Sequence, residues 1–148
     1  MTQLSILDIA TVPALPVGVP FQPGSRTSRA AAARLAPKVA GRREPVLALF
    51  RSGEQLTADE VAQRLAWKNT WARPRVCEAA KWGVLVDTQT ERPSDDGSPA
   101  AVYRYATALE LADTLRDAQN VAQFDDRPNR RAEAANWARV IRAEMEAA

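Results

Sequence analysis

The 148-residue sequence contains no histidine and only one cysteine, Cys77. A single cysteine cannot form a disulfide within the chain, and without imidazoles or a second thiolate the usual zinc cages cannot be built. The absence of histidine also removes the side chain that most often acts as a general base. No glycine-rich phosphate loop is present. We therefore expect no catalytic residues, no metal site and no cofactor, and we expect that the protein is not an enzyme.

Long apolar runs are also missing from the sequence. An apolar fraction of 46% is ordinary for a soluble protein. No run approaches the roughly 18 apolar residues that a membrane span requires. The N-terminus has no basic region ahead of an apolar one, so no secretion signal is evident. These features predict a cytoplasmic protein without a membrane partner.

Proline is frequent only near the N-terminus, where residues 13, 16, 20 and 23 are all proline. This spacing excludes a long helix and favours an extended arm, partly in polyproline II conformation. We expect residues 1–26 to form this arm. It either remains without fixed structure or docks on its own domain or on a partner protein.

A helix is predicted over residues 70–82. Asn69 or Thr70 offers the side-chain oxygen of an N-cap, and Gly83 ends the helix. Pro74 then falls at the fourth helical residue, where its missing N–H costs little because no intrahelical acceptor exists there. The alternation that follows predicts a hairpin.

Helical spacing divides this helix into a small apolar face and an outer face. The outer face is predicted to carry Thr70, Trp71, Pro74, Glu78 and Lys81. Arg75 lies at its margin. Arg73 lies closer to the packing face, so we expect it to brace the fold or a neighbouring carboxylate.

The predicted hairpin has brief strands at residues 84–86 and 101–105. Residues 88–99 form a long, polar, turn-rich tip between them. Leu56 precedes a helix start and is a candidate for a short strand that pairs with this hairpin. A helix followed by such a hairpin is the outline of a winged helix-turn-helix.

Three helical segments precede this helix, over residues 27–35, 41–51 and 57–65. The first is expected to stop near Pro37. The third opens with Thr57 and Glu60, which have the spacing of a capping box. Only residues 66–68 separate it from the next helix, as a helix-turn-helix requires.

Two more helices are predicted after Thr107 and after Pro128. The last one carries a narrow apolar stripe that either folds back on the domain or pairs with a second copy in a homodimer. The sequence thus predicts a mainly α protein with an extended arm (1–26), a winged-helix domain of three core helices and a β-hairpin wing (27–106), and a C-terminal helical extension (107–148).

Basic residues are concentrated in the predicted winged-helix domain, although the net charge is only +2. Residues 27–43 contain no acid, which suits either phosphate neutralisation or a solvated basic face. We expect Arg75 to contact guanine, Thr70 and Trp71 to touch thymine methyls or backbone, and the lysines and lead-in arginines to hold phosphates. The predicted DNA-binding residues are Lys68, Thr70, Trp71, Arg75, Lys81, Arg92, Arg42 and Arg43, with Arg92 reaching a minor groove.

Five stretches between residues 27 and 105 also carry a family likeness. They are T-S-R-A-A-A, V-L-A-L-F, L-T-A-D-E-V-A-Q-R-L, R-P-R-V-C-E-A-A-K-W-G-V-L-V-D and E-R-P-S-D-D-G-S-P-A-A-V-Y-R-Y. In order and spacing, this half of the chain resembles small winged-helix proteins of bacteriophages and prophages. The resemblance implies a DNA-binding phage or prophage regulator in the host cytoplasm. Asp95 and Asp96 depart from the neutral or basic wing tips of such proteins.

Two functions remain open from the sequence. The first is a double-stranded DNA-binding protein that reads the major groove with helix 70–82. The second is a protein-protein interaction module on a winged-helix scaffold, which uses the arm and the C-terminal helices. The clustered Arg and Lys favour the first, and the modest net charge favours the second.

Overall fold

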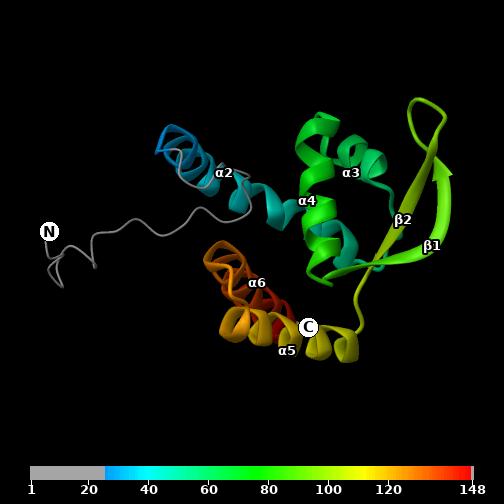
Figure 1. Cartoon of the computed structure of the whole chain (residues 1–148). Coiled ribbons are helices and arrows are strands. Elements are labelled where there is room, and N and C mark those ends of the chain that lie inside the picture. The colour runs from blue at the N-terminus through cyan, green and yellow to red at the C-terminus, as the bar shows by residue number, and fades with distance from the viewer. Residues whose placement is uncertain (1–25, 148) are drawn as a thin grey trace, which may run out of the picture.

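The computed structural model describes residues 26–147, so the predicted arm lies, except for Arg26, outside the described residues. The described part is mainly helical with one antiparallel hairpin (Figure 1), as the sequence predicts. The elements are α2 (Arg26–Arg51), α3 (Ala58–Leu65), α4 (Asn69–Lys81), β1 (Leu85–Pro93), β2 (Pro99–Tyr105), α5 (Ala108–Phe124) and α6 (Pro128–Ala147).

Helix α2 corrects the prediction of two separate segments, because it continues through both Pro37 and Pro45. Each proline removes one backbone hydrogen bond, but alanine and other strong helix formers surround Pro37 and keep the helical conformation favourable. Gly41 is not among the positive-φ residues and does not break the helix. The basic lead-in therefore belongs to the same rigid element as the first core helix.

Helix α3 is capped at both ends, which fixes the turn into α4. The Thr57 side chain accepts a hydrogen bond from the backbone N–H of Glu60 at 3.2 Å, which is one of the two bonds of the predicted capping box. At the other end, Ala66 adopts a left-handed conformation with φ of 53°. Its N–H and that of Trp67 donate to carbonyls of the last helical turn.

Helix α4 begins at Asn69, two residues before the first helical residue that a cap at Thr70 would give. Lys68 occupies the N-cap position and makes no side-chain capping hydrogen bond, so neither Asn69 nor Thr70 serves as the cap. Pro74 is consequently the sixth helical residue rather than the fourth. At that position it leaves the carbonyl of Thr70 without its usual N–H donor, a cost that burial of the opposite face must offset.

The hairpin is longer than predicted, and its tip is reduced to residues 94–98. The strands extend because an irregularity between Asp87 and Glu91 absorbs the mismatch in register. Within it, Gln89 takes a φ of 62° and its N–H donates to Asp87 Oδ1 at 2.8 Å. The predicted pairing of Leu56 is confirmed, since Leu56 and Tyr103 exchange backbone hydrogen bonds.

One continuous apolar core joins α2, α3, α4 and the hairpin to the C-terminal helices. Helices α5 and α6 lie side by side (Figure 1), and α5 opens with a full capping box between Thr107 and Glu110. The apolar stripe of α6 folds back within the chain: Ala134, Trp137 and Ile141 are all 0% exposed. This settles the alternative left open by the sequence and makes the stripe unavailable to a second copy.

Gly83 sets the distance between the end of α4 and α5. Its φ is +79°, and an added Cβ would lie 2.5 Å from Oγ1 of Thr114. We expect Gly83→Ala to lower the free energy of unfolding by about 2–4 kcal/mol, because the strained backbone conformation and the overpacking against Thr114 both destabilise the variant. Gly53→Ala is the matched control: its φ is +92°, but no described atom lies within 4 Å of the new Cβ. Urea unfolding that gives equal losses for both variants would contradict a packing role for Gly83.

Candidate nucleic-acid interface

The outer face of α4 is the surface that the sequence assigned to DNA. The opposite face packs in the core through Ala72, Val76 and Ala79. The exposed side chains along the outside include Thr70, Trp71, Pro74, Cys77 and Lys81. Trp71 is 40% exposed, which is unusual for so large an apolar side chain. A helix exposed along its whole length can enter a groove or meet a partner protein.

Arg75 lies elsewhere than predicted. A guanine contact needs an exposed guanidinium, but Arg75 is only 8% exposed and its Nε lies 3.5 Å from Glu78 Oε2. Burial lowers the pKa of Arg75, because removal from water disfavours its charged form. Glu78 was predicted on the outer face and also points inward. Arg75 therefore belongs to the structural interior in this conformation.

Arg43 is the second predicted contact that the structure places inside. Its Nη2 donates to Glu78 Oε1 at 3.1 Å, and its guanidinium stacks over the Trp137 ring at 4.6 Å. Glu78 thereby bridges Arg43 of α2 and Arg75 of α4. The bond from Arg43 to Glu78 spans 35 positions of sequence, so no local pattern could have revealed it.

Arg42, by contrast, remains at the surface and connects α2 to α4. Its guanidinium lies over the ring of Trp71 at 4.2 Å. Arg34 and Lys38 are exposed and precede it at intervals of four residues, which places all three along one side of α2. Lys68, also exposed, lies one turn before Trp71. We call Arg34, Lys38, Arg42 and Lys68 the basic ridge. Within residues 26–147, none of the four forms an ion pair.

Arg92, predicted to enter a minor groove, is tied to α3 instead. Its Nη1 donates to both carboxylate oxygens of Glu60, at 2.7 and 2.8 Å, and to the carbonyl of Gln55 at 3.1 Å. Its side chain is still 47% exposed, so the pair is a weak surface interaction. Arg92 would have to exchange Glu60 for a phosphate to contact DNA.

The hairpin tip is acidic and lies against α3 and α4. Asp95 Oδ1 accepts from the Gln63 side chain at 3.0 Å, and Asp95 Oδ2 accepts from the Asn69 side chain at 3.3 Å. Asp96 is held within the tip, where it accepts from Ser94, from the Ser98 hydroxyl and, at 3.0 Å, from the Ser98 N–H. The carboxylate of Asp95 therefore lies at the first residue of α4.

Asp59 connects the hairpin tip to α4. It is 3% exposed and accepts from the Asp95 N–H at 3.1 Å and from Arg73 Nη2 at 2.8 Å. These two contacts hold the pKa of Asp59 below its usual range. The bond confirms the prediction that Arg73 braces a neighbouring carboxylate. The tip is thus fixed next to α4 and adds negative charge there.

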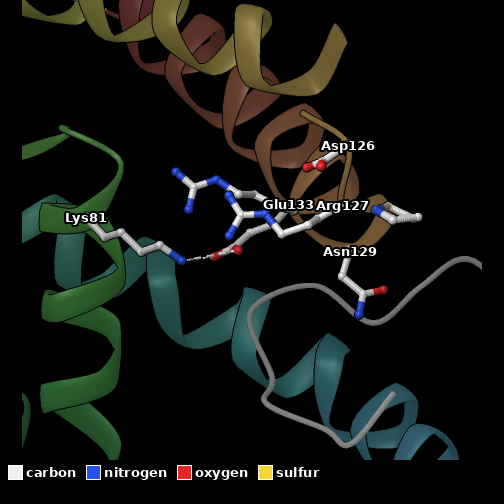
Figure 2. Close-up of a pocket in the computed structure, with 7 residues that line it drawn as sticks. Lys81, Asp126, Arg127, Asn129 and Glu133 are labelled. Carbon is white, nitrogen blue, oxygen red and sulfur yellow. Dashed lines mark hydrogen bonds and ion pairs between the residues drawn. The ribbon is translucent and has the colours of Figure 1, made fainter. Parts of the chain in front are cut away.

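Lys81, at the other end of α4, is paired across a cleft of about 560 Å³ (Figure 2). Its Nζ lies 3.1 Å from Glu133 Oε1, which also accepts from the indole N–H of Trp82 at 3.0 Å. The cleft is lined by Lys81, Asp126, Arg127, Pro128, Asn129, Arg130 and Glu133. Because acids face its cations, this cleft offers less positive charge than the basic ridge.

The predicted site is therefore only partly brought together. One surface contains Thr70, Trp71, Lys68 and Arg42, and Lys81 lies at its far end. The other three predicted residues each pair with a glutamate of the same chain: Arg75 and Arg43 with Glu78, and Arg92 with Glu60. Sequence reasoning placed Arg34 and Lys38 in the acid-free basic lead-in but did not include them among the predicted DNA-binding residues. Their four-residue spacing ahead of Arg42 was the available signal.

Two comparisons with known proteins found no relative. The sequence matches no protein-family model, and a search of curated proteins found no significant match. Among residues 26–147, no cluster of three or more Cys, Asp or Glu side chains is arranged to hold a metal ion. No helix in this part of the chain is long and apolar enough to cross a membrane.

Proposed function

We propose that the chain is a winged-helix protein that binds double-stranded DNA through the outer face of α4 and the basic ridge. The order of helices and strands, the short turn before α4 and the bridge from Leu56 to the hairpin support the winged-helix assignment. The observation that carries the DNA proposal is the ridge: four surface cations that lead directly onto the exposed helix.

Phosphate contacts supply most of the affinity in this proposal. Four-residue steps along α2 separate Arg34, Lys38 and Arg42 by about 6 Å each, so the row can follow a DNA backbone. Lys68 holds a further phosphate at the N-terminal end of α4, where the helix dipole also favours an anion. The Arg42–Trp71 stack keeps the two helices in register for this contact.

Base reading is limited in this proposal, because Arg73, the exposed arginine of α4, is bonded to Asp59. Thr70 and Trp71 can contact thymine methyls, while the bidentate reading of guanine predicted for Arg75 would require its pair with Glu78 to open. The acidic tip repels phosphate beside the first turn. The proposal therefore assigns the protein a strong non-specific component and a modest sequence preference.

The test is a titration of the protein into labelled double-stranded DNA of random sequence, at about 50 and 200 mM salt. With four phosphate contacts, the counterion-release slope predicts about a hundredfold loss of affinity for the wild type. The triple variant Arg34→Ala, Lys38→Ala, Lys68→Ala removes three contacts, so we expect weak binding that depends little on salt. The variant Arg131→Ala, Arg139→Ala, Arg142→Ala removes three exposed charges of α6 instead and is expected to retain wild-type binding.

Two results would contradict the proposal. One is no wild-type binding at tens of micromolar protein in low salt. The other is equal weakening by the α2/α4 and α6 triple variants, which would indicate a general effect of net charge rather than a binding surface.

A protein-protein interaction module is the second candidate. It is favoured by the internal pairing of Arg43, Arg75 and Arg92, which leaves less free positive charge than the sequence suggested. Under this function, Trp71 and the acidic tip contact a partner protein. The full chain is then the bait in a pull-down. Loss of partner capture by Trp71→Ala, together with absent DNA binding, would select this function.

A further inference from the structure

A cavity of about 390 Å³ lies where the ends of four elements meet. Arg51 ends α2, Tyr105 ends β2, Ala108 begins α5, and the cavity extends to the last turn of α6. Figure 1 shows that end of α6, in red, beside α5. The lining residues are Arg51, Tyr105, Ala106, Ala108, Leu111, Glu144, Met145 and Ala147. The volume falls in the range of roughly 300–1,000 Å³ that small-molecule sites occupy.

Most of the cavity wall is apolar, as is usual for ligand sites. Leu111 is 2% exposed, and Met145 is half-buried. The three alanines of the wall carry only a methyl group each, so the space between the elements stays open. The polar lining residues are Arg51, Tyr105 and Glu144, and they are bonded to one another. The cavity therefore combines apolar walls with one convergent polar group.

Glu144 is the buried carboxylate of this polar group, at 5% exposure. Its Oε2 accepts from Arg51 Nε at 2.7 Å and from the Tyr105 hydroxyl, and its Oε1 accepts from Arg51 Nη2. Burial and the bond to Glu144 raise the pKa of Tyr105, so its hydroxyl stays a donor. A carboxylate offers about four acceptor positions. Bonds within residues 26–147 fill three of them, which leaves one position on Oε1 for a donor in the cavity.

The charge beside the cavity is negative, because two carboxylates share one guanidinium. Arg51 Nη1 and Nη2 also donate to Glu44, at 2.5 and 2.9 Å, so one negative charge is left over. These bonds raise the pKa of Arg51 and lower the pKa of Glu44, which keeps both groups charged. Arg104 and Glu110, at the start of α5, pair at 2.7 Å and add no net charge. The last turn of α6 contains no basic residue that would offset the excess.

We propose that this cavity binds a small organic cation, an ammonium group carried on an apolar body. The ammonium group donates to Glu144 Oε1 in a charge-assisted bond and balances the excess charge, while the apolar body contacts Leu111 and Met145. The Tyr105 ring in the wall attracts a cation through its π face. An anion is disfavoured, because it would have to displace one of the two carboxylates that Arg51 already binds. This site uses neither α4 nor the basic ridge, so it does not depend on DNA binding.

Three phenyl compounds of similar size test the charge of the ligand: 2-phenylethylamine, 2-phenylethanol and phenylacetate. Backbone amide shifts in NMR spectra of the full chain give each dissociation constant. We expect the amine to bind with a dissociation constant of about a millimolar, as suits so small a compound, and about tenfold or more tightly than the alcohol. Phenylacetate should bind more weakly than either. Equal binding of amine and alcohol, or tighter binding of phenylacetate, would overturn the choice of a cation, and no shifts with any compound at about 10 mM would overturn the site.

Ala108→Leu tests the place of binding without changing any charge. Ala108 is exposed in the first turn of α5, so a leucine can be accommodated there while its side chain fills the cavity. We expect a loss of affinity for 2-phenylethylamine of about tenfold or more, with an unchanged Tm. Ala112→Leu adds the same side chain one turn later on α5, outside the cavity lining, and should bind like the wild type. Wild-type affinity in Ala108→Leu would place the amine elsewhere and overturn the proposal.

Glu44→Gln tests the excess charge from outside the cavity. The Glu44 side chain is 66% exposed and does not line the cavity, and its replacement leaves Arg51 and Glu144 as a neutral pair. The affinity for 2-phenylethylamine should fall about threefold or more, while the affinity for 2-phenylethanol should stay unchanged. Glu54→Gln, which breaks the surface pair with Arg64, is the control and should change neither. An equal effect of Glu44→Gln on amine and alcohol, or no effect on the amine, would overturn the role of the excess charge.

Discussion

Glu78→Ala is expected to lower the free energy of unfolding by about 3–5 kcal/mol, because it leaves two buried guanidinium groups without their shared carboxylate. The side chains of Arg43, Arg75 and Glu78 are 11%, 8% and 9% exposed. Water therefore cannot replace the lost charge. For a chain of this length, such a loss corresponds to a fall in Tm of about 10 °C or more.

Urea and thermal unfolding of three variants would separate charge from packing. Glu78→Gln keeps the shape and one acceptor, and should lose most but not all of the same stability. Glu54→Ala breaks the Arg64 pair at the surface, where the side chains are 50% and 38% exposed, and should change stability by less than about 1 kcal/mol. A loss for Glu78→Ala as small as that of Glu54→Ala would show that the buried cluster is hydrated.

The local elements of this fold could be predicted because local chemistry determines them. The Thr57 cap, Gly83 with its positive φ and the Thr107–Glu110 capping box all appear where sequence signals place a boundary. Each depends on neighbours within four residues. Apolar periodicity likewise identified the buried side of α6. The order of helices and strands followed from these signals.

The errors arose where a local signal was outweighed, either by neighbouring residues or by distant contacts. Proline signals predicted a break in α2, but alanine-rich flanks keep one helix through Pro37. The polar stretch after Thr88 was predicted as loop, yet cross-strand bonds extend both strands to the prolines at 93 and 99. A sequence cannot show which partner strand is available to such a stretch.

The candidate site could be located from the sequence better than its residues could be assigned. The exposed face of α4 was found from helical spacing, since periodicity separates outside from inside. Periodicity does not place a long side chain at the margin, however. Arg75 lay at that margin, and it turned inward because Glu78 supplies a buried charge partner that it shares with Arg43. That partnership depends on how α2 packs on α4.

The same cluster connects the two halves of the chain through Trp137, which predicts a second large effect. Trp137→Ala should lower the free energy of unfolding by about 3–5 kcal/mol, because Trp137 is 0% exposed and its loss leaves a cavity in the shared core. Arg43 also loses the ring on which it stacks. Trp137→Phe should lose less, since the buried indole N–H has no hydrogen-bond acceptor among the described residues to forfeit.

The form of the unfolding curve distinguishes one domain from two. Because one core includes residues from α2 to α6, Trp137→Ala should unfold in a single transition, with circular dichroism and tryptophan fluorescence changing together. An independent C-terminal extension would instead melt first and leave the hairpin and α2–α4 intact. Two separated transitions, or a loss below about 1 kcal/mol, would show that α5 and α6 are an appendage. A single shifted transition would mean that α2 to α6 and the hairpin unfold as one cooperative domain.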